Sequence, residues 1–424
     1  MFGQGNTERH DELKAEVRAF AEREVAPRVA RIEAAGGVER GLAWEIARRG
    51  WIGVTIDSAY GGMGAGHVAK VLVIEELARV CGALGAAAQA SQLPVAMIDN
   101  FGSEEQKRRW LPPIAAGEIM PTIDVTEEVS GSQIGGMQGR ARRRPGGWVL
   151  NAVKTHVGNS HVANLHCVVV RTADSGPGSL SAFLVESERG GVSVRPQVPA
   201  VALAGFSFGT VVFEDVWVPE ENLLGAVGDG RDVADSASVL NGRVNLGAVS
   251  LGVHRATVET TLAFAAERQR YGKSLSELGS VEQRLGQMVS NLMTAQTVLY
   301  AAADMLDRGT QCDGQLMNAK LVNYELGTGS AKLGLEVHAA SGLFTDRPIE
   351  RYFRDAHAIF APAGTSDVQR LRLARFALGT AQQPEWSQLF AAPTKMVGAA
   401  TAGRVTATLG PGGRGGTAPA GRVP

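Results

Sequence analysis

The chain has 424 residues, with 42 basic and 43 acidic side chains and three widely separated cysteines, Cys81, Cys167 and Cys312. This length is sufficient for two or three domains with a sizeable core, and the balanced charge argues against a nucleic-acid or membrane-surface partner. No run of about 18 apolar residues predicts a transmembrane span, and the polar N-terminus lacks the apolar segment of a signal peptide. We therefore expect a cytoplasmic protein with free thiols.

The first 119 residues have the periodicity of α-helices. Apolar residues recur about every 3.6 positions from Asp11 onward, and Ser103, which two glutamates follow, is a good helix start. The glycine-rich stretch 60–66 has no βαβ pattern around it and no closing Gly-Lys-Ser/Thr, so we interpret it as a loop and not as a phosphate-binding loop. Residues 1–119 are predicted to form an N-terminal all-α domain.

The remaining chain divides into three parts of different character. In residues 120–235, short β-branched runs alternate with turn-forming residues, which predicts an antiparallel β-barrel or sandwich. Helical periodicity returns in residues 236–382, where long helices over 281–299 and 319–340 are typical of a four-helix bundle. Residues 383–424 are rich in Gly, Ala, Thr and Pro and are predicted to form a disordered tail. The predicted fold class is therefore α+β.

Six motifs occur in order along this chain. They are FGSEEQKRRWLPPIAAGE (101–118), VTEEVSGSQ (125–133), LNAVKTHVGNS (150–160), FEDVWVPEENLLG (213–225), ERQRYGKSL (267–275) and ERYFRDAHAIFAPAGTSDVQR (350–370). Together they make the chain, over about residues 11–378, similar to the acyl-CoA dehydrogenases. The resemblance is strong because all six motifs occur in the order found in that family.

The resemblance implies FAD between the β-domain and the C-terminal bundle, and an acyl thioester, carried on CoA or on a carrier protein, against the flavin. A cation or helix N-terminus is needed for the FAD pyrophosphate, and Arg268 of a neighbouring subunit is the implied cation. The implied cofactor-binding residues are Thr126, Ser132, His156, Val157, Gly158, Arg268, Tyr271, His338, Gly342, Thr365 and Asp367. Ser132 and Arg243 are the implied substrate contacts.

Several positions depart from the family pattern at the cofactor. The family's Trp-Ile-Thr is His156-Val157-Gly158 here, a glutamine is replaced by Gly279, and the family's Gln-x-x-Gly-Gly becomes the segment that begins at His338. Each lost hydrogen bond costs about 0.5–1.5 kcal/mol, so three or four losses weaken binding by roughly tens to thousands of times. We therefore expect weak or substoichiometric FAD.

The catalytic base is also missing from its usual places. The family commonly carries a glutamate immediately before the Gly-Thr, where this chain has Ala363, and some members carry it directly before an arginine, where this chain has Gly242. Abstraction of an α-proton by a positioned base contributes about 10²–10⁴-fold to the rate. Asp367 is the nearest carboxylate in sequence, but it lies one helical turn beyond Ala363, so it is a weak candidate.

Three functions are compatible with these observations. The first is a flavin-dependent dehydrogenase that oxidises an acyl thioester at the α,β-position. The second is a flavin monooxygenase or oxidase of the same fold, which needs no α-proton base, and the third is a non-catalytic subunit that binds an acyl thioester or completes a partner's site. The resemblance implies a homodimer or homotetramer, or a heteromer with a catalytic paralogue. The spacing of the histidines predicts no metal site.

Overall fold

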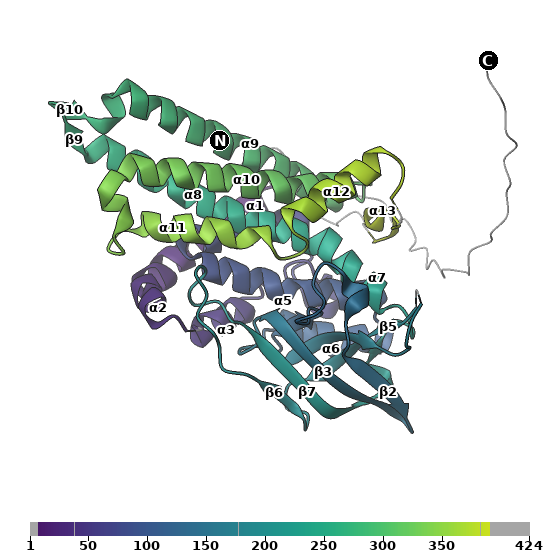
Figure 1. Cartoon of the computed structure of the whole chain (residues 1–424). Helices are drawn as coiled ribbons and strands as arrows, with labels where there is room; N and C mark the ends of the chain where they lie inside the picture. Colours follow the sequence, from purple (N-terminus) through teal and green to yellow (C-terminus); the bar gives the residue numbers. More distant parts are fainter. Residues whose placement is uncertain (1–6, 38, 177, 382, 391–424) are drawn as a thin grey trace, which may run out of the picture.

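The computed structural model describes residues 7–37, 39–176, 178–381 and 383–390. The N-terminal helices lie between the C-terminal helices and the β-sheet (Figure 1). Ser103 starts one of them as predicted, because its Oγ accepts the N–H of Gln106 at 3.2 Å and the Gln106 side chain accepts the N–H of Ser103 at 3.0 Å. These helices are α1 (Glu8–Phe20), α2 (Val29–Ala35), α3 (Arg40–Arg48), α4 (Gly66–Val80), α5 (Gly82–Phe101) and α6 (Glu104–Ala115).

The middle part is a β-sheet domain, as predicted. Its strands are β1 (Pro121–Asp124), β2 (Arg140–Arg144), β3 (Gly147–Gly158), β4 (Leu165–Arg171), β5 (Leu180–Glu186), β6 (Val192–Val194), β7 (Phe208–Pro219) and β8 (Leu223–Leu224). They follow the order β6-β7-β3-β2-β4-β5-β8, with β1 paired to β4. Most pairs are antiparallel, while β1 and β2 each run parallel to β4. The chain therefore passes from α6 directly into the sheet, because β1, the first strand after the helices, pairs with β4.

The C-terminal part is a helical domain whose two longest predicted helices are confirmed. Its helices are α7 (Gly230–Ala237), α8 (Arg243–Glu267), α9 (Gly279–Asp307), α10 (Asp313–His338), α11 (Pro348–His357) and α12 (Ser366–Ala377). A hairpin, β9 (Gln269–Arg270) and β10 (Lys273–Ser274), joins α8 to α9. Within the described part of the chain, no helix has both the length and the apolar character that crossing a membrane requires.

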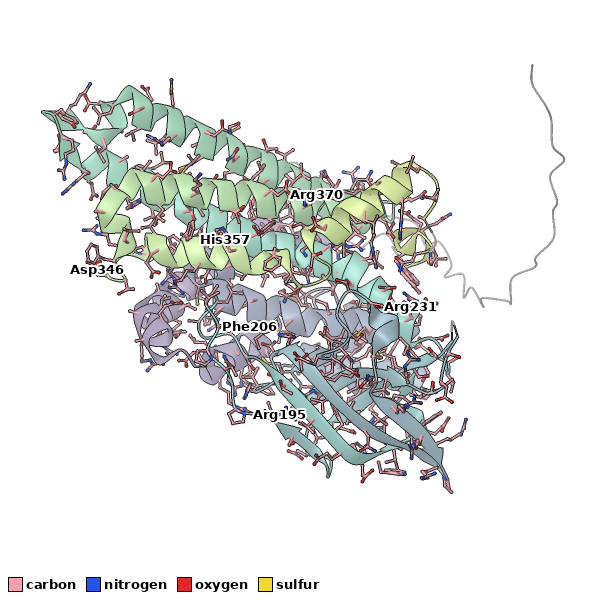
Figure 2. All side chains as sticks on the ribbon, in the orientation of Figure 1. Arg195, Phe206, Arg231, Asp346, His357 and Arg370 are labelled. Atoms are coloured by element: carbon pink, nitrogen blue, oxygen red, sulfur yellow. The ribbon has the colours of Figure 1, made fainter. Side chains whose placement is uncertain are left out.

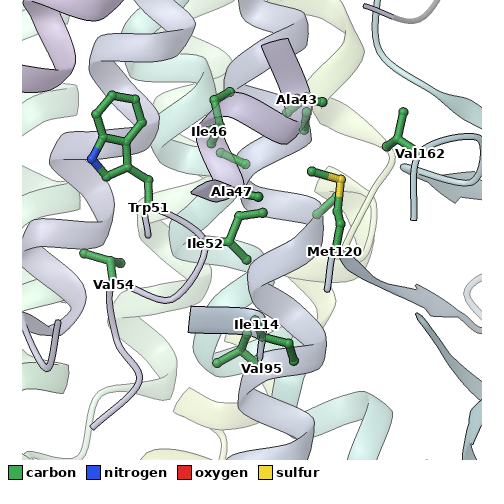
Figure 3. Close-up of a cluster of buried hydrophobic side chains, with 14 of the residues drawn as sticks. Ala43, Ile46, Ala47, Trp51, Ile52, Val54, Val95, Ile114, Met120 and Val162 are labelled. Atoms are coloured by element: carbon green, nitrogen blue, oxygen red, sulfur yellow. The ribbon is translucent and has the colours of Figure 1, made fainter. Parts of the chain in front are cut away.

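A shared apolar core joins the first two domains. Ile46 of α3, Val95 of α5 and Ile114 of α6 are each at most 2% exposed, and they belong to the same buried cluster as Trp51 and Met120 (Figure 3). Met120 immediately precedes β1, so the same cluster packs the helices against the sheet. Burial of each large apolar side chain stabilises the fold by about 1.5–3 kcal/mol.

Buried polar contacts fix helix α8 against α4. At Gly252 a Cβ would lie 2.5 Å from the carbonyl oxygen of Glu75, so the two helices approach more closely than any larger residue permits. The Glu75 carboxylate is fully buried and accepts Nε of Arg255 at 2.7 Å and the hydroxyl of Tyr300 at 2.5 Å. Because this buried charge is paired, it ties α4, α8 and α9 together at a smaller cost than an unpaired buried carboxylate would have.

The predicted disordered tail over 383–424 is wrong for its first residues. A short helix, α13 (Trp386–Phe390), packs against the bundle, and Trp386 is 2% exposed. The carboxylate of Asp313 accepts two backbone N–H groups at the start of α13, at 2.8 and 2.9 Å. The aromatic side chains of Trp386 and Phe390 pack against the bundle and dock this segment. The polar composition of the stretch did not reveal their role. Residues 391–424 lie outside the described residues.

We expect Asp313→Ala to lower the free energy of unfolding by about 1–2 kcal/mol, because it removes the cap of α13. Limited proteolysis of the full chain should then cleave near residue 386 faster than in the wild type. Asp174→Ala is the matched control, because Asp174 is 91% exposed and pairs only at the surface with Arg140, where an ion pair contributes about 0–1 kcal/mol. Equal stability of the two variants would contradict the docking role of Asp313.

Candidate active site

The two positions without a catalytic carboxylate lie in direct contact. A Cβ added at Gly242 would lie 3.0 Å from Cβ of Ala363 and 3.6 Å from Cδ2 of Leu93 on α5. Gly242 ends a short π-helical segment, Ser238–Gly242, that opens α8, and such segments are frequent at functional sites. A carboxylate carried at either position would therefore reach the same small region. Sequence reasoning identified both positions but could not show that they face each other.

Side chains of α10 and α12 hold the loop that carries Ala363 in place through hydrogen bonds. Lys320 of α10 donates from Nζ to the carbonyl oxygens of Pro362 and Gly364, and Gln369 donates to the carbonyl oxygen of Ala363 at 2.9 Å. Ala363 itself has φ of 53°, in the left-handed region that non-glycine residues rarely adopt. This backbone conformation persists because several hydrogen bonds determine it.

Neither Lys320 nor Gln369 was predicted from the sequence. Lys320 is a single cation within the apolar stretch LMNAKLV, and its 2% exposure shows that it does not reach solvent. A buried cation in an otherwise apolar helix face was the available signal, because such a group needs partners. Its partners come from about 40 residues further along the chain, and no local pattern reveals them.

The surroundings of the two positions are electropositive. Burial, and to a smaller extent the charge of Arg243, lowers the pKa of Lys320 to about 7. Burial also lowers the pKa of Arg243 to about 9, and Arg372 contributes in the same direction, while Asp313 and Asp235 oppose the shift. Arg243, one of the predicted substrate contacts, is therefore a buried cation, and Asp313 and Asp235 do not offset the effect of its burial.

Thr365 and Asp367 follow Ala363 but have different surroundings. The hydroxyl of Thr365 accepts the N–H of Val368 at 3.3 Å, so Thr365 is the N-cap of α12. The Asp367 side chain is 93% exposed and pairs with Arg370 at 3.0 Å. In this structure Asp367 therefore faces solvent and not the contact between Gly242 and Ala363.

A second group of predicted residues lies where the sheet meets α5. His156 is exposed, with φ of 55°, and its ring centroid lies 5.5 Å from that of Phe208. At Gly158 a Cβ would lie 2.8 Å from Cζ of Phe206 and 3.2 Å from Cβ of Ala90. Phe206 lies between the helices and the sheet (Figure 2), so its ring takes the space that a threonine at position 158 would need. Phe206 was not predicted from the sequence.

These residues fit a flavin ring in part. The hydroxyl of Thr155 is buried without a hydrogen-bond partner among the described residues, and its N–H donates to the carbonyl oxygen of Thr126 at 2.8 Å. An unpaired buried hydroxyl needs a polar partner, and the heteroatom edge of a flavin would supply one. Ser132 is exposed on the adjoining loop, whereas Val157 is packed in the core of the β-domain, which leaves only its backbone for a ligand.

The third group of predicted residues lies at the other end of the bundle. Arg268 is exposed at the end of α8, and Tyr271 is 91% exposed in the β9–β10 hairpin. His338 is buried and stacks on Phe264 with ring centroids 4.1 Å apart, and Gly342 packs against its Cβ. Figure 1 places this hairpin at the end of α8 opposite α7 and the sheet. A single chain therefore does not bring these residues to His156 and Gly158.

Comparison with known proteins agrees with this architecture. Residues 7–118, 122–216 and 228–378 match the N-terminal, middle and C-terminal domains of the acyl-CoA dehydrogenases, respectively. An acyl-CoA dehydrogenase of Bacillus subtilis is 30% identical over 369 residues, which cover 87% of this chain and 97% of that protein. The fold is that of flavin-dependent oxidoreductases that act on acyl thioesters. The chain belongs to the acyl-CoA dehydrogenase family.

Solved structures show the same fold. A glutaryl-CoA dehydrogenase in complex with glutaryl-CoA superposes with a TM-score of 0.85 at 25% identity, over 90% of this chain and 98% of that chain. The butyryl-CoA dehydrogenase of Megasphaera elsdenii superposes with a TM-score of 0.86 at 24% identity, over 89% of this chain and all of that chain. The predicted three-domain fold is thereby confirmed.

We expect Gly158→Ala to cost about 1–3 kcal/mol of stability, because the new methyl group would overlap the ring of Phe206. Urea denaturation of Gly158→Ala, Phe206→Ala and the double variant measures the energetic coupling between the two positions. The double variant should lose less free energy of unfolding than the two single variants lose in sum. Gly131→Ala is the control, because a Cβ added at Gly131 would meet no atom within 4 Å among the described residues beyond its chain neighbours. Strictly additive effects would show that Phe206 does not occupy this space.

Proposed function

We propose that the chain is a flavin-dependent acyl-thioester dehydrogenase whose site lacks a protein carboxylate as its α-proton base. The observation that carries this proposal is the direct contact of Gly242 with Ala363, at the two positions where the family places the base. The family comparisons favour oxidation of an acyl thioester over the same-fold monooxygenase and over a non-catalytic subunit. The same comparisons support acyl-CoA as the substrate class.

In such a site, different described residues would have different roles. Gly242, Leu93 and Ala363 would contact the acyl chain near its α-carbon, while Lys320 holds the backbone of the Ala363 loop. When bound, FAD would supply the acceptor for the hydride that leaves the β-carbon. Removal of the α-proton is then the step without a protein group at its usual positions, which leaves it slow.

Binding of FAD would depend on two regions of the protein. Thr126, Thr155, His156 and Gly158 would meet the ring, and we propose that FAD is held weakly because Phe206 occupies the place of a threonine side chain. Arg268 of a second subunit would meet the pyrophosphate, which makes the chain a homodimer or homotetramer. Its three cysteines are free and buried, which supports the cytoplasm as its location.

Ala363→Glu should raise the rate of flavin reduction by an added acyl-CoA by up to about 10²–10⁴-fold, because it restores a positioned base. Anaerobic stopped-flow absorbance of the FAD-loaded protein measures this rate. Ala361→Glu is the matched control, since Ala361 lies in the same loop but is exposed, and it should leave the rate unchanged. Rapid reduction in the wild type would show that another group is the base.

Arg268→Ala should weaken FAD binding about tenfold or more, since it removes a charge-assisted hydrogen bond to the pyrophosphate. Quenching of flavin fluorescence measures the dissociation constant, and light scattering measures the oligomeric state of the same samples. Arg270→Ala in the same exposed hairpin is the control. If FAD binds a monomeric chain and neither substitution changes the affinity, Arg268 has no role at the cofactor.

A further inference from the structure

A fully buried lysine, Lys70 of α4, is hydrogen-bonded to the segment that ends at Gly242. Its Nζ donates to Oδ1 of Asn241 at 2.6 Å and lies 2.8 Å from Nδ1 of His67. Asn241 is 5% exposed and lies in the π-helical segment Ser238–Gly242. Because a buried ammonium group without hydrogen bonds is strongly unfavourable, the contact with Lys70 constrains where Asn241 lies.

The carboxylate that acts on Lys70 is already used by the start of α4. The oxygens of Asp307, at the end of α9, accept the N–H groups of His67 at 2.6 Å and of Val68 at 2.9 Å. Burial lowers the pKa of Lys70 to about 7, and the charge of Asp307 only partly opposes this shift. Burial also lowers the pKa of His67 well below its usual range, with a smaller contribution from the charge of Lys70. Lys70 therefore donates to neutral acceptors, and Asn241 is the one that belongs to another element.

Helix α4, the π-helical segment and the Ala363 loop pack together. Leu72 of α4 and Leu240 of the segment belong to one buried apolar cluster, against which Ala363 packs. Gly242, the last residue of the segment, contacts Ala363. Since the backbone hydrogen bonds of a helical segment form cooperatively, its residues keep their places relative to one another. A hydrogen bond that fixes Asn241 therefore also fixes Gly242.

We propose that Lys70 is a positioning residue of the site, because it holds the π-helical segment through Asn241 and so sets the place of Gly242. The inference rests on the proposed function, in which Gly242 and Ala363 contact the acyl chain of a bound thioester. Lys320 holds the Ala363 loop from α10. The contact between the two positions is thus fixed by one buried lysine on each side.

The protonation of Lys70 should affect thioester binding and stability with opposite signs. A hydrogen bond from an ammonium group is roughly twice as strong as one from a neutral amine, so the affinity should fall about fivefold between about pH 6 and about pH 8.5. The pKa of Lys70 lies below its ordinary value of 10.5 in the folded chain. The unfolded chain therefore binds more protons between pH 7 and 10.5, and the contribution of Lys70 to stability rises with pH.

Isothermal titration calorimetry of the FAD-loaded protein with butyryl-CoA, at both pH values, tests the proposal. Lys70→Met should weaken binding about fivefold at the lower pH and reduce the pH dependence. Because the pKa of Lys320 is also about 7, the share of Lys70 is the part that this variant removes. Asn241→Leu should have the same effect, and the double variant should bind no more weakly than either single variant.

Lys107→Met is the matched control, because Lys107 is also buried, at 6% exposure, but lies in α6 and pairs with Asp99 at 3.8 Å. It should keep the affinity and its pH dependence. Unchanged binding in both Lys70→Met and Asn241→Leu would overturn the inference and leave the proposed function intact. Asn241→Leu retains the lysine and decides the matter alone if Lys70→Met does not fold. Absence of butyryl-CoA binding by the wild type at either pH would overturn both.

Discussion

The site depends on one buried contact, in which the ammonium group of Lys320 binds the backbone of the loop around Ala363. Nζ donates to the carbonyl oxygens of Pro362 and Gly364, and this fixes Ala363 against Gly242 at the start of α8. The three donors of a lysine can be satisfied only by several acceptors, and the loop supplies them by placing Ala363 at positive φ. The position of α8 is set in turn by the buried pair between Glu75 and Arg255 on its other side.

The architecture could be predicted because it is set by local patterns. Helical periodicity, the start of α6 at Ser103 and the turn-separated β-branched runs each report on a few neighbouring residues. The tail was mispredicted because a polar composition concealed Trp386, whose burial is made possible by Asp313, more than 70 residues earlier. Composition describes an average, whereas one buried aromatic side chain is enough to dock a short helix.

The candidate site was predictable only as far as the motifs extend. They identified Gly242 and Ala363 as positions without a carboxylate, but not their contact, which joins residues about 120 positions apart. The overlap between Phe206 and position 158 is likewise a long-range contact. At Gly158 and Gly242 the small residue occurs where a neighbour fills the space, whereas among the described residues nothing lies within 4 Å of a Cβ added at Gly279. Phe206 therefore fills the space beside Gly158, and the nearby hydroxyl of Thr155 has no hydrogen-bond partner among the described residues.

The central claim is that no protein carboxylate removes the α-proton at this site. Exchange of the α-hydrogens of a bound acyl-CoA with deuterated solvent, followed by proton NMR, measures that step alone. It requires neither hydride transfer nor an electron acceptor. The account predicts exchange at the rate seen without protein, although the thioester is bound. Exchange accelerated by the wild-type protein by a factor of about 10² or more would contradict it.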